Sequence, residues 1–214
     1  PFNFALKFQY RELKTFIHPK MKTRKDIKFI KRFSETKLKK SDFDKFIKVL
    51  KKQNFYSIST PFDEDSVKLI EKQNLDIIKI ASCSFNDWPL LERIVENHKP
   101  IIASTAGASE KEIDKVVSFL QHRKKEFAIM HCVAEYPTPD KNINLAQINY
   151  LKKRYPNVRI GFSTHENPSD ERFILMAYSM GASIFERHVA LPSNQFSINE
   201  YSSTPQQIDQ WLKA

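Results

Sequence analysis

The stretch Arg159-Ile-Gly-Phe-Ser-Thr-His165 indicates a short buried strand that ends in side chains able to bind a metal or an anion. The stretch Ser183-Ile-Phe-Glu-Arg-His188 repeats this pattern and ends in Glu186 and His188. In a barrel of parallel strands, side chains at the C-terminal strand ends converge on one face. Each histidine by itself is more typical of a partly buried loop residue. The repeated placement makes His165 and His188 candidate metal ligands that share one site.

The rest of the chain alternates between helical and strand patterns from residue 41 onward. A helix capped by Ser41 is predicted where apolar residues follow i, i+3, i+4, i+7 spacing from Phe43 to Leu50. The segment Ser109-x-x-Glu112 is a capping box that predicts a helix start. The segment Thr204-Pro205-x-Gln207 is predicted to cap a last helix, with Pro in its first turn. The other helices are expected at 63–73, 89–97, 144–154 and 168–180, and the strands at 5–9, 56–60, 76–82, 100–105, 127–133, 158–163 and 182–188.

The strand segments are continuous apolar runs, which is typical of parallel strands covered by helices. We therefore predict an α/β fold, a TIM (β/α)8 barrel, forming one domain over residues 1–214. Seven strands are found where a closed barrel needs eight, and the first β/α unit is expected upstream of this chain. A doubly wound open sheet is the alternative, but a chain with only 3 glycines lacks the glycine-rich phosphate loop of that fold.

Composition excludes several classes of protein. The chain of 214 residues is 41% hydrophobic, and no apolar run approaches the roughly 18 residues of a membrane span. Its 2 cysteines, Cys83 and Cys132, form neither a disulfide framework nor a CxxC metal motif. We therefore expect a cytoplasmic protein with no membrane partner.

The net charge of +10 raises the question of nucleic-acid binding. Residues 11–52 contain 16 Lys and Arg against 5 Asp and Glu, so the rest of the chain is close to neutral. These lysines are scattered, without an RNA-binding or zinc-finger motif, and indicate a solvated basic face rather than a nucleic-acid partner. The polar segment 10–40 is expected to be a long loop with a helical piece near 24–33, and a substrate lid is one hypothesis for it.

Nearly every strand ends in a polar or ionisable side chain. Lys7 and Lys79 lie inside apolar strands, where an ammonium group without an anionic partner is unfavourable. Two lysines together with the hydroxyls of Thr60, Ser82 and Ser104 would suit a small dianion such as a phosphate ester. Snorkelling of both lysines to the rim is the alternative interpretation. Two histidines beside such an anion suit a divalent metal acting as a Lewis acid on a carbonyl oxygen.

Seven ordered motifs resemble the sialic acid synthase family, which includes N-acetylneuraminate, legionaminate and pseudaminate synthases. They are Lys7-Phe-Gln9, Ser59-Thr-Pro-Phe-Asp63, Lys79-Ile-Ala-Ser82, Ser104-Thr105, His131-Cys132-x-x-x-Tyr-Pro137, Gly161-x-Ser-x-His165 and Glu186-x-His188.

The resemblance implies a role for each matching residue. His165 and His188 are similar to the two metal-ligating histidines of the family, which requires Mn²⁺ or Mg²⁺. The phosphoenolpyruvate pocket of the family corresponds to Lys7, Thr60, Lys79, Ser82, Ser104 and Ser163. Groups that face the sugar or assist proton transfer correspond to Gln9, Tyr136 and Glu186, which with Lys79 are the catalytic candidates.

The reaction that the resemblance implies joins phosphoenolpyruvate to an N-acetylated hexose, such as an N-acetylmannosamine-like aldehyde. The products are a nine-carbon 2-keto sugar acid and phosphate, for surface polysaccharide biosynthesis. The resemblance also implies a homodimer in the full-length protein and a C-terminal antifreeze-like domain that this chain lacks. Thr164 and Ala134 depart from the residues usual in the family, which bears on the acceptor sugar.

Three other hypotheses remain. Another barrel that uses phosphoenolpyruvate, or a metal aldolase, would act on a different acceptor. A non-catalytic barrel would bind a sugar or a partner through the same pocket. A nucleic-acid binder acting through residues 11–52 would bind with a steep salt dependence.

Overall fold

A computed structural model describes residues 2–24, 26–194 and 197–214 of the chain. The chain is divided into two compact units. Unit 1 comprises residues 1–101 and 122–126, and unit 2 comprises residues 102–121 and 127–214. Each unit is described by itself below.

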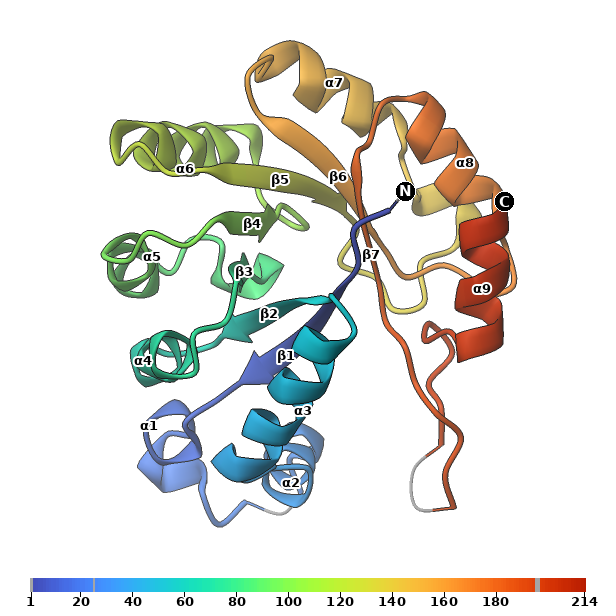
Figure 1. Ribbon diagram of the computed structural model, residues 1–214. Coiled ribbons are helices and arrows are strands. Elements are labelled where there is room, and N and C mark those ends of the chain that lie inside the picture. The colour runs from blue at the N-terminus through green and yellow to red at the C-terminus, as the bar shows by residue number, and fades with distance from the viewer. Residues whose placement is uncertain (1, 25, 195–196) are drawn as a thin grey trace. The chain divides into compact units, whose positions relative to one another are not determined.

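Unit 1 alternates parallel strands with helices, as the apolar periodicity predicts. Strand β1 pairs with β2, and β2 pairs with β3, in both cases in parallel (Figure 1). The elements of this unit are β1 (Ala5–Tyr10), α1 (Leu13–Phe16), η1 (Pro19–Met21), α2 (Lys28–Glu35), α3 (Lys40–Lys52), β2 (Tyr56–Pro61), α4 (Glu64–Lys72), β3 (Ile77–Ile80), η2 (Ser82–Ser84) and α5 (Trp88–Val95).

Helix α3 covers one face of β1. The ring centroids of Phe8 and Phe43 are 5.5 Å apart, and those of Tyr10 and Phe43 are 4.7 Å apart. This contact explains why Phe43 belongs to the apolar stripe recognised in the sequence. The prediction that Ser41 caps this helix is wrong, because α3 begins at Lys40 and the backbone N–H of Lys39 donates to Asp42 at 3.3 Å.

The segment after β1 is more regular than the predicted long loop, since α1, η1 and α2 occupy much of it. The predicted helical piece near 24–33 is displaced to Lys28–Glu35. The guanidinium carbon of Arg11 lies 3.8 Å from the ring centroid of Phe62 and 4.4 Å from that of Phe33. Burial lowers the pKa of Arg11 to about 10. This arginine therefore anchors the segment through cation–π contacts.

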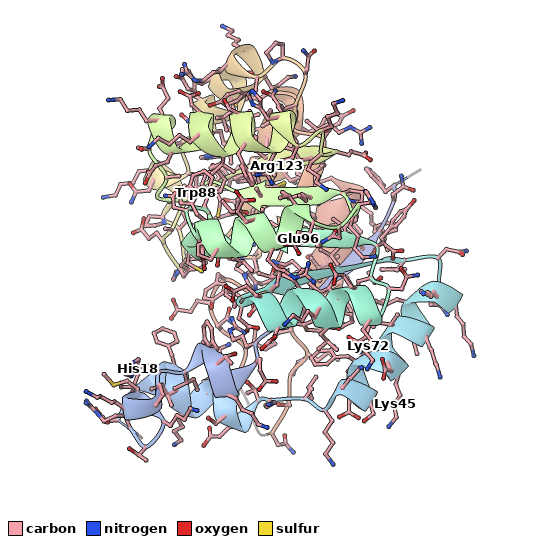
Figure 2. All side chains as sticks on the ribbon, turned by 90° about the vertical axis from the view of Figure 1, so that its left-hand side faces the viewer. His18, Lys45, Lys72, Trp88, Glu96 and Arg123 are labelled. Carbon is pink, nitrogen blue, oxygen red and sulfur yellow. The ribbon has the colours of Figure 1, made fainter. Side chains whose placement is uncertain are left out.

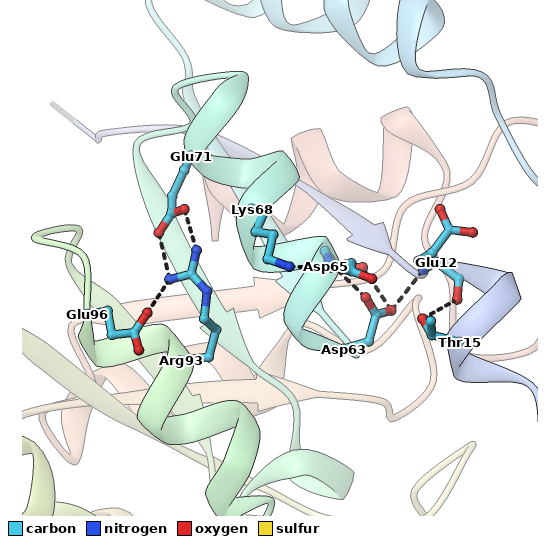
Figure 3. Close-up of polar contacts among 9 residues, drawn as sticks. Glu12, Thr15, Asp63, Asp65, Lys68, Glu71, Arg93 and Glu96 are labelled. Carbon is cyan, nitrogen blue, oxygen red and sulfur yellow. Dashed lines mark hydrogen bonds and ion pairs between the residues drawn. The ribbon is translucent and has the colours of Figure 1, made fainter.

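Asp63 fastens the same segment to the end of β2 (Figure 3). Its carboxylate accepts hydrogen bonds from the backbone N–H of Glu12 at 2.8 Å and of Ser66 at 2.7 Å. The second bond caps helix α4 at its N-terminus. The aspartate of the Ser59–Asp63 motif thus has a structural role, holding the chain that follows β1 against the chain that follows β2.

Helices α4 and α5 are joined by Arg93, which contacts Glu71 and Glu96 (Figure 3). The guanidinium nitrogens lie 2.5 Å from Glu71 Oε2 and 3.0 Å from Glu96 Oε2. Figure 2 shows Lys45 on α3, Lys72 on α4 and Glu96 after α5 directed outward from this side of unit 1. The three side chains are exposed, as expected for the solvated faces of amphipathic helices.

Unit 2 continues the same alternation. Strand β5 pairs with β6, and β6 pairs with β7, again in parallel. The capping boxes are confirmed: Ser109 accepts from Glu112 N at 3.4 Å, and Thr204 from Gln207 N at 3.3 Å. Besides β4 (Ile101–Ser104), which begins at the last residue of the long segment of unit 1, the elements are α6 (Glu110–His122), β5 (Phe127–Cys132), η3 (Asp140–Asn142), α7 (Ala146–Arg154), β6 (Arg159–Thr164), α8 (Arg172–Ser179), β7 (Ile184–Arg187) and α9 (Pro205–Lys213).

These observations establish a parallel α/β fold in both units, in agreement with the predicted TIM-like architecture. Closure into an eight-stranded barrel, the upstream first β/α unit and the single-domain organisation stay predictions. Among the described residues, every helix is too short or too polar to cross a lipid bilayer.

Candidate functional site

In unit 1, the predicted site residues of β1 and β2 lie on one face of the sheet. The register pairs Lys7 with Ile58 and Gln9 with Thr60. Cross-strand partners point to the same side and alternate along each strand, so Lys7, Gln9 and Thr60 share a face. Phe8 and Tyr10 point to the other face, against α3. The face with Lys7 is therefore the one that α3 leaves uncovered.

Lys79 belongs to the same face of unit 1. The register pairs Ile58 with Ile77, and Lys79 follows Ile77 by two positions on β3. Its side chain is almost fully withdrawn from solvent, at 2% exposure. A snorkelling lysine would keep its ammonium group in water. The burial of Lys79 therefore contradicts the snorkelling interpretation for this residue, whereas Lys7 is half-buried.

The hydroxyl groups beside these lysines are candidates for ligand contact. Thr60 Oγ1 is buried and makes no hydrogen bond within the described part of the chain. A buried hydroxyl without a partner is unfavourable, and a bound oxyanion would satisfy it. Ser82 opens the short helix η2 directly after β3, where it is half-buried. Unit 1 thus presents two lysines and two hydroxyls in its strands or just after them.

In unit 2, Ser163 and Glu186 occupy neighbouring positions on one face of the sheet. They are register partners, and Ser163 Oγ donates a hydrogen bond to Glu186 Oε1 at 3.0 Å. Cys132 is the partner of Ser163 on the other side, so all three side chains point the same way. Gly161 lies on this face as well, where a Cβ atom would come within 2.6 Å of the Ile184 carbonyl oxygen.

The same parity places His165 and His188 together. The centroids of the two imidazole rings are 5.3 Å apart, and His165 is 4% exposed. His165 Nδ1 lies 4.0 Å from Cys132 Sγ. The predicted pairing of the two histidines at the strand ends is thus observed within unit 2.

The geometry of the pair fits two ligands of one metal ion. Because a ring nitrogen lies about 2.1 Å from a bound transition metal, two imidazoles on one ion have centroids roughly 4.5–6.5 Å apart. The observed separation of 5.3 Å falls in that range. Within the described ranges no set of three or more His, Cys, Asp or Glu side chains is grouped to hold a metal. His165 and His188 could therefore hold an ion whose other positions are open to ligands from elsewhere, as catalytic sites require.

Two tyrosines lie against the histidine pair. The ring centroid of Tyr136 is 4.1 Å from that of His165, and Tyr136 is 50% exposed. The ring centroid of Tyr201 lies 5.3 Å from that of His188 and 5.3 Å from that of Tyr136. Tyr136 belongs to the predicted set, whereas Tyr201 does not. Tyr201 comes from the polar segment between β7 and α9, and no periodicity or motif there indicates a site residue.

A buried ion pair lies on the opposite side of the two strands from Ser163 and Glu186. Arg187 is the register partner of Thr164, and its guanidinium group binds the carboxylate of Glu166. Both side chains are only 1% exposed. Burial raises the pKa of Glu166, and the charge of Arg187 opposes that rise. The sequence signal for this pair is that each histidine has a charged neighbour, Glu166 after the first and Arg187 before the second.

The remaining strand-end residues of unit 2 are Ser104 and Thr105, at the end of β4, and His131, near the end of β5. Ser104 is buried at the end of β4, and Thr105 donates a hydrogen bond to the Met130 carbonyl at 3.0 Å. His131, the first residue of its family motif, points away from Ser163 because it precedes Cys132 by one position. Its Nε2 lies 2.7 Å from the Ile143 carbonyl oxygen, and burial lowers its pKa. His131 is therefore a structural residue.

Comparison with a family model matches residues 4–213 of this chain to the NeuB family. The chain is 32% identical over 162 residues to the N,N'-diacetyllegionaminic acid synthase of Campylobacter jejuni, covering 74% of this chain and 48% of that protein. Over 191 residues it is 30% identical to the uncharacterised protein MJ1065 of Methanocaldococcus jannaschii, covering 89% of this chain and 54% of that protein. The chain therefore spans about half the length of these curated relatives.

Solved structures of two proteins are similar to this chain. The Chromobacterium violaceum protein described as spore coat polysaccharide biosynthesis protein E is 54% identical, with a TM-score of 0.96 over 99% of this chain and 63% of that one. The N-acetylneuraminic acid (sialic acid) synthetase of Leptospira borgpetersenii, in complex with citrate, is 27% identical. Its TM-score is 0.86 over 98% of this chain and 70% of that one.

Proposed function

The chain belongs to the NeuB family, and on this premise we propose that it provides the barrel of an enzyme that condenses phosphoenolpyruvate with an N-acetylated hexose. The product would be a nine-carbon 2-keto sugar acid used in polysaccharide biosynthesis. Relatives named as sialic, legionaminic and pseudaminic acid synthases support this substrate class. The single observation that carries the proposal is the pair of imidazoles at the ends of β6 and β7, with Ser163 and Glu186 beside it.

The histidine pair has the chemistry that the reaction needs. His165 and His188 would hold Mn²⁺ or Mg²⁺, and when bound this ion would polarise the aldehyde oxygen of the open-chain sugar. The two residues would orient the sugar carbonyl, because imidazoles held at fixed positions restrict where an electrophile can lie. Tyr136 is half-exposed against His165 and would contact the sugar.

Glu186 would serve in proton transfer. Its carboxylate accepts a hydrogen bond from Ser163 at 3.0 Å, which holds one oxygen in a defined position. In the proposed reaction, C3 of phosphoenolpyruvate forms a bond to the aldehyde carbon, and the aldehyde oxygen gains a proton. Water then adds at C2, and the C2–O bond to phosphate breaks. Glu186 would take one proton from this water and supply the one that the aldehyde oxygen gains, and the second water proton would leave with the phosphate as C2 becomes a keto group.

Phosphoenolpyruvate carries a phosphate and a carboxylate, and unit 1 offers groups that bind such anions. Lys7 and Lys79 would supply the positive charges, and Thr60 and Ser82 would donate hydrogen bonds through their hydroxyls. Gln9 would face the sugar, and Ser104, at the end of β4 in unit 2, stays a candidate for binding an anion. The buried hydroxyl of Thr60, which has no partner within the described residues, supports this assignment.

Phosphate release tests the proposal. The full-length protein that contains this chain would be incubated with phosphoenolpyruvate, Mn²⁺ and a panel of N-acetylated hexoses, with His188→Ala as the inactive control. We expect phosphate release that requires the sugar and disappears in the control. Release from no sugar of the panel, together with no binding of Mn²⁺, would contradict the proposal and favour a non-catalytic barrel.

A further inference from the structure

We propose that Arg187 is a positioning residue that sets the geometry of the histidine pair by tying three segments together from behind the sheet. The inference rests on the proposed function, because it concerns the metal that His165 and His188 would hold. The three segments are the turn after β6, strand β7 and the segment 199–204 before α9.

The guanidinium group of Arg187 uses all of its nitrogens in this linkage. One terminal nitrogen binds the carboxylate of Glu166, and the other donates to the Glu166 carbonyl at 3.1 Å. Its Nε donates to Ser203 Oγ at 2.6 Å. The planar fork of an arginine can hold such a set of partners in fixed directions, whereas a lysine presents only a point charge.

Arg187 and its partner Glu166 are each adjacent in sequence to one of the two candidate metal ligands. Glu166 directly follows His165, so fixing its backbone and its side chain also fixes the backbone that presents the first imidazole. Arg187 directly precedes His188 on β7 and points to the other face of the sheet. One side chain thus constrains both histidines through their neighbours, without touching either ring.

The third partner connects the linkage to Tyr201. Ser203 donates its backbone N–H to the His188 carbonyl at 2.9 Å, and its own carbonyl accepts from Ala190 N at 2.9 Å. These bonds form the isolated bridge between Val189 and Ser203. The segment is therefore fastened alongside the end of β7 twice, once by backbone bonds and once by Arg187. Tyr201 is two residues away and packs against both histidines.

Burial makes the linkage rigid but does not by itself argue for stability. A buried ion pair often contributes little net free energy, since desolvation of both charges offsets their attraction, and an apolar replacement of similar volume is often tolerated. Partners that orient metal ligands from outside the coordination sphere have a different effect. Their loss typically weakens metal affinity by about 10–100-fold. The two roles can therefore be separated by experiment.

The test measures Mn²⁺ affinity and thermal unfolding of the full-length protein for three variants. In Glu166→Leu/Arg187→Met the ion pair is replaced by apolar side chains. Arg187→Lys keeps the positive charge beside Glu166, but a lysine cannot make the three hydrogen bonds of the planar guanidinium group. Ser203→Ala removes only the bond to Nε. The control is Glu71→Leu/Arg93→Met, which removes a partly exposed ion pair between two helices of unit 1.

We expect the double variant to unfold near the wild-type temperature and to bind Mn²⁺ about 10–100-fold more weakly, since it loses an orienting partner. Arg187→Lys should bind Mn²⁺ more tightly than the double variant but more weakly than the wild type. Ser203→Ala should show the smallest loss of Mn²⁺ affinity, and the control pair should bind Mn²⁺ like the wild type. Wild-type affinity in the folded Arg187 variants would overturn the inference. If the double variant does not fold, unchanged affinity in Arg187→Lys and Ser203→Ala would overturn it. A wild type that binds no Mn²⁺ would overturn both this inference and the proposed function.

Discussion

The two units supply different chemistry at their strand ends, and they position it in different ways. In unit 1 the candidate groups Lys7, Thr60 and Lys79 are part of the strands, and the sheet register alone aligns them on one face. In unit 2 the histidines lie just beyond the strands, and His165 is supported by a turn held from behind by Arg187. A flexible anion tolerates approximate placement of charges, whereas a metal requires ligands at defined distances and angles. The buried ion pair of Glu166 and Arg187 lies directly next to the candidate ligands of unit 2, where this precision is needed.

The largest expected effect concerns the histidine pair. His165→Ala or His188→Ala removes one of the two candidate ligands and should weaken Mn²⁺ binding by more than the about 10–100-fold typical of an outer partner. Isothermal titration with Mn²⁺ measures this. His18→Ala is the control, since His18 is exposed in unit 1. Equal Mn²⁺ affinity in the wild type and both variants would show that His165 and His188 are not metal ligands.

The next effect concerns the anion-binding set of unit 1. Lys79→Met keeps the length of the side chain and removes its charge, so a bound phosphate or carboxylate loses a charge-assisted hydrogen bond. Such bonds contribute about 1.5–3 kcal/mol, which corresponds to a KM for phosphoenolpyruvate raised by roughly 10–150-fold. Steady-state kinetics with varied phosphoenolpyruvate measures it.

The matched control for Lys79 is Lys72→Met, which removes an exposed lysine from α4 (Figure 2). We expect no change in KM for this control. A Lys79→Met enzyme with an unchanged KM for phosphoenolpyruvate would show that the charge of unit 1 serves another purpose.

The smallest effect distinguishes His131 from the two candidate ligands. Burial lowers its pKa in the folded protein, so below the ordinary histidine pKa of about 6.5 the unfolded state binds more protons. Stability should therefore fall with decreasing pH below that value, by up to about 1.4 kcal/mol per pH unit. Denaturant unfolding between pH 7 and pH 5 measures the slope. His131→Gln should flatten it, and an unchanged slope would contradict the structural role.

The sequence predicted most of the elements because their local patterns are strong. The capping box at Ser109 and Glu112 appears where expected, because both reciprocal bonds depend only on residues three apart. The predicted cap at Ser41 is wrong because the local sequence does not specify it uniquely. Several residues near a helix start can serve as caps, and the packing of Phe43 on β1 selects which turn begins the helix.

The candidate site was predicted in part. The two histidines were recognised because they end similar apolar runs, and the structure places their rings 5.3 Å apart. His131 could not be assigned to a face from the sequence, because one position decides which face a strand residue occupies. Only the register with β6 shows that Cys132, rather than His131, shares the face of Ser163.

By itself, then, the sequence determined the parallel α/β pattern, the family and the strand ends at which the chemistry lies. The tertiary structure decided which of those side chains meet, and it added Tyr201 and the linkage of Arg187 to Ser203. The physical reason is the range of the interactions. Periodicity and capping act over a few neighbouring residues, whereas the ring contacts of Tyr201 with the two histidines join residues 13 and 36 positions apart, and only folding brings these together.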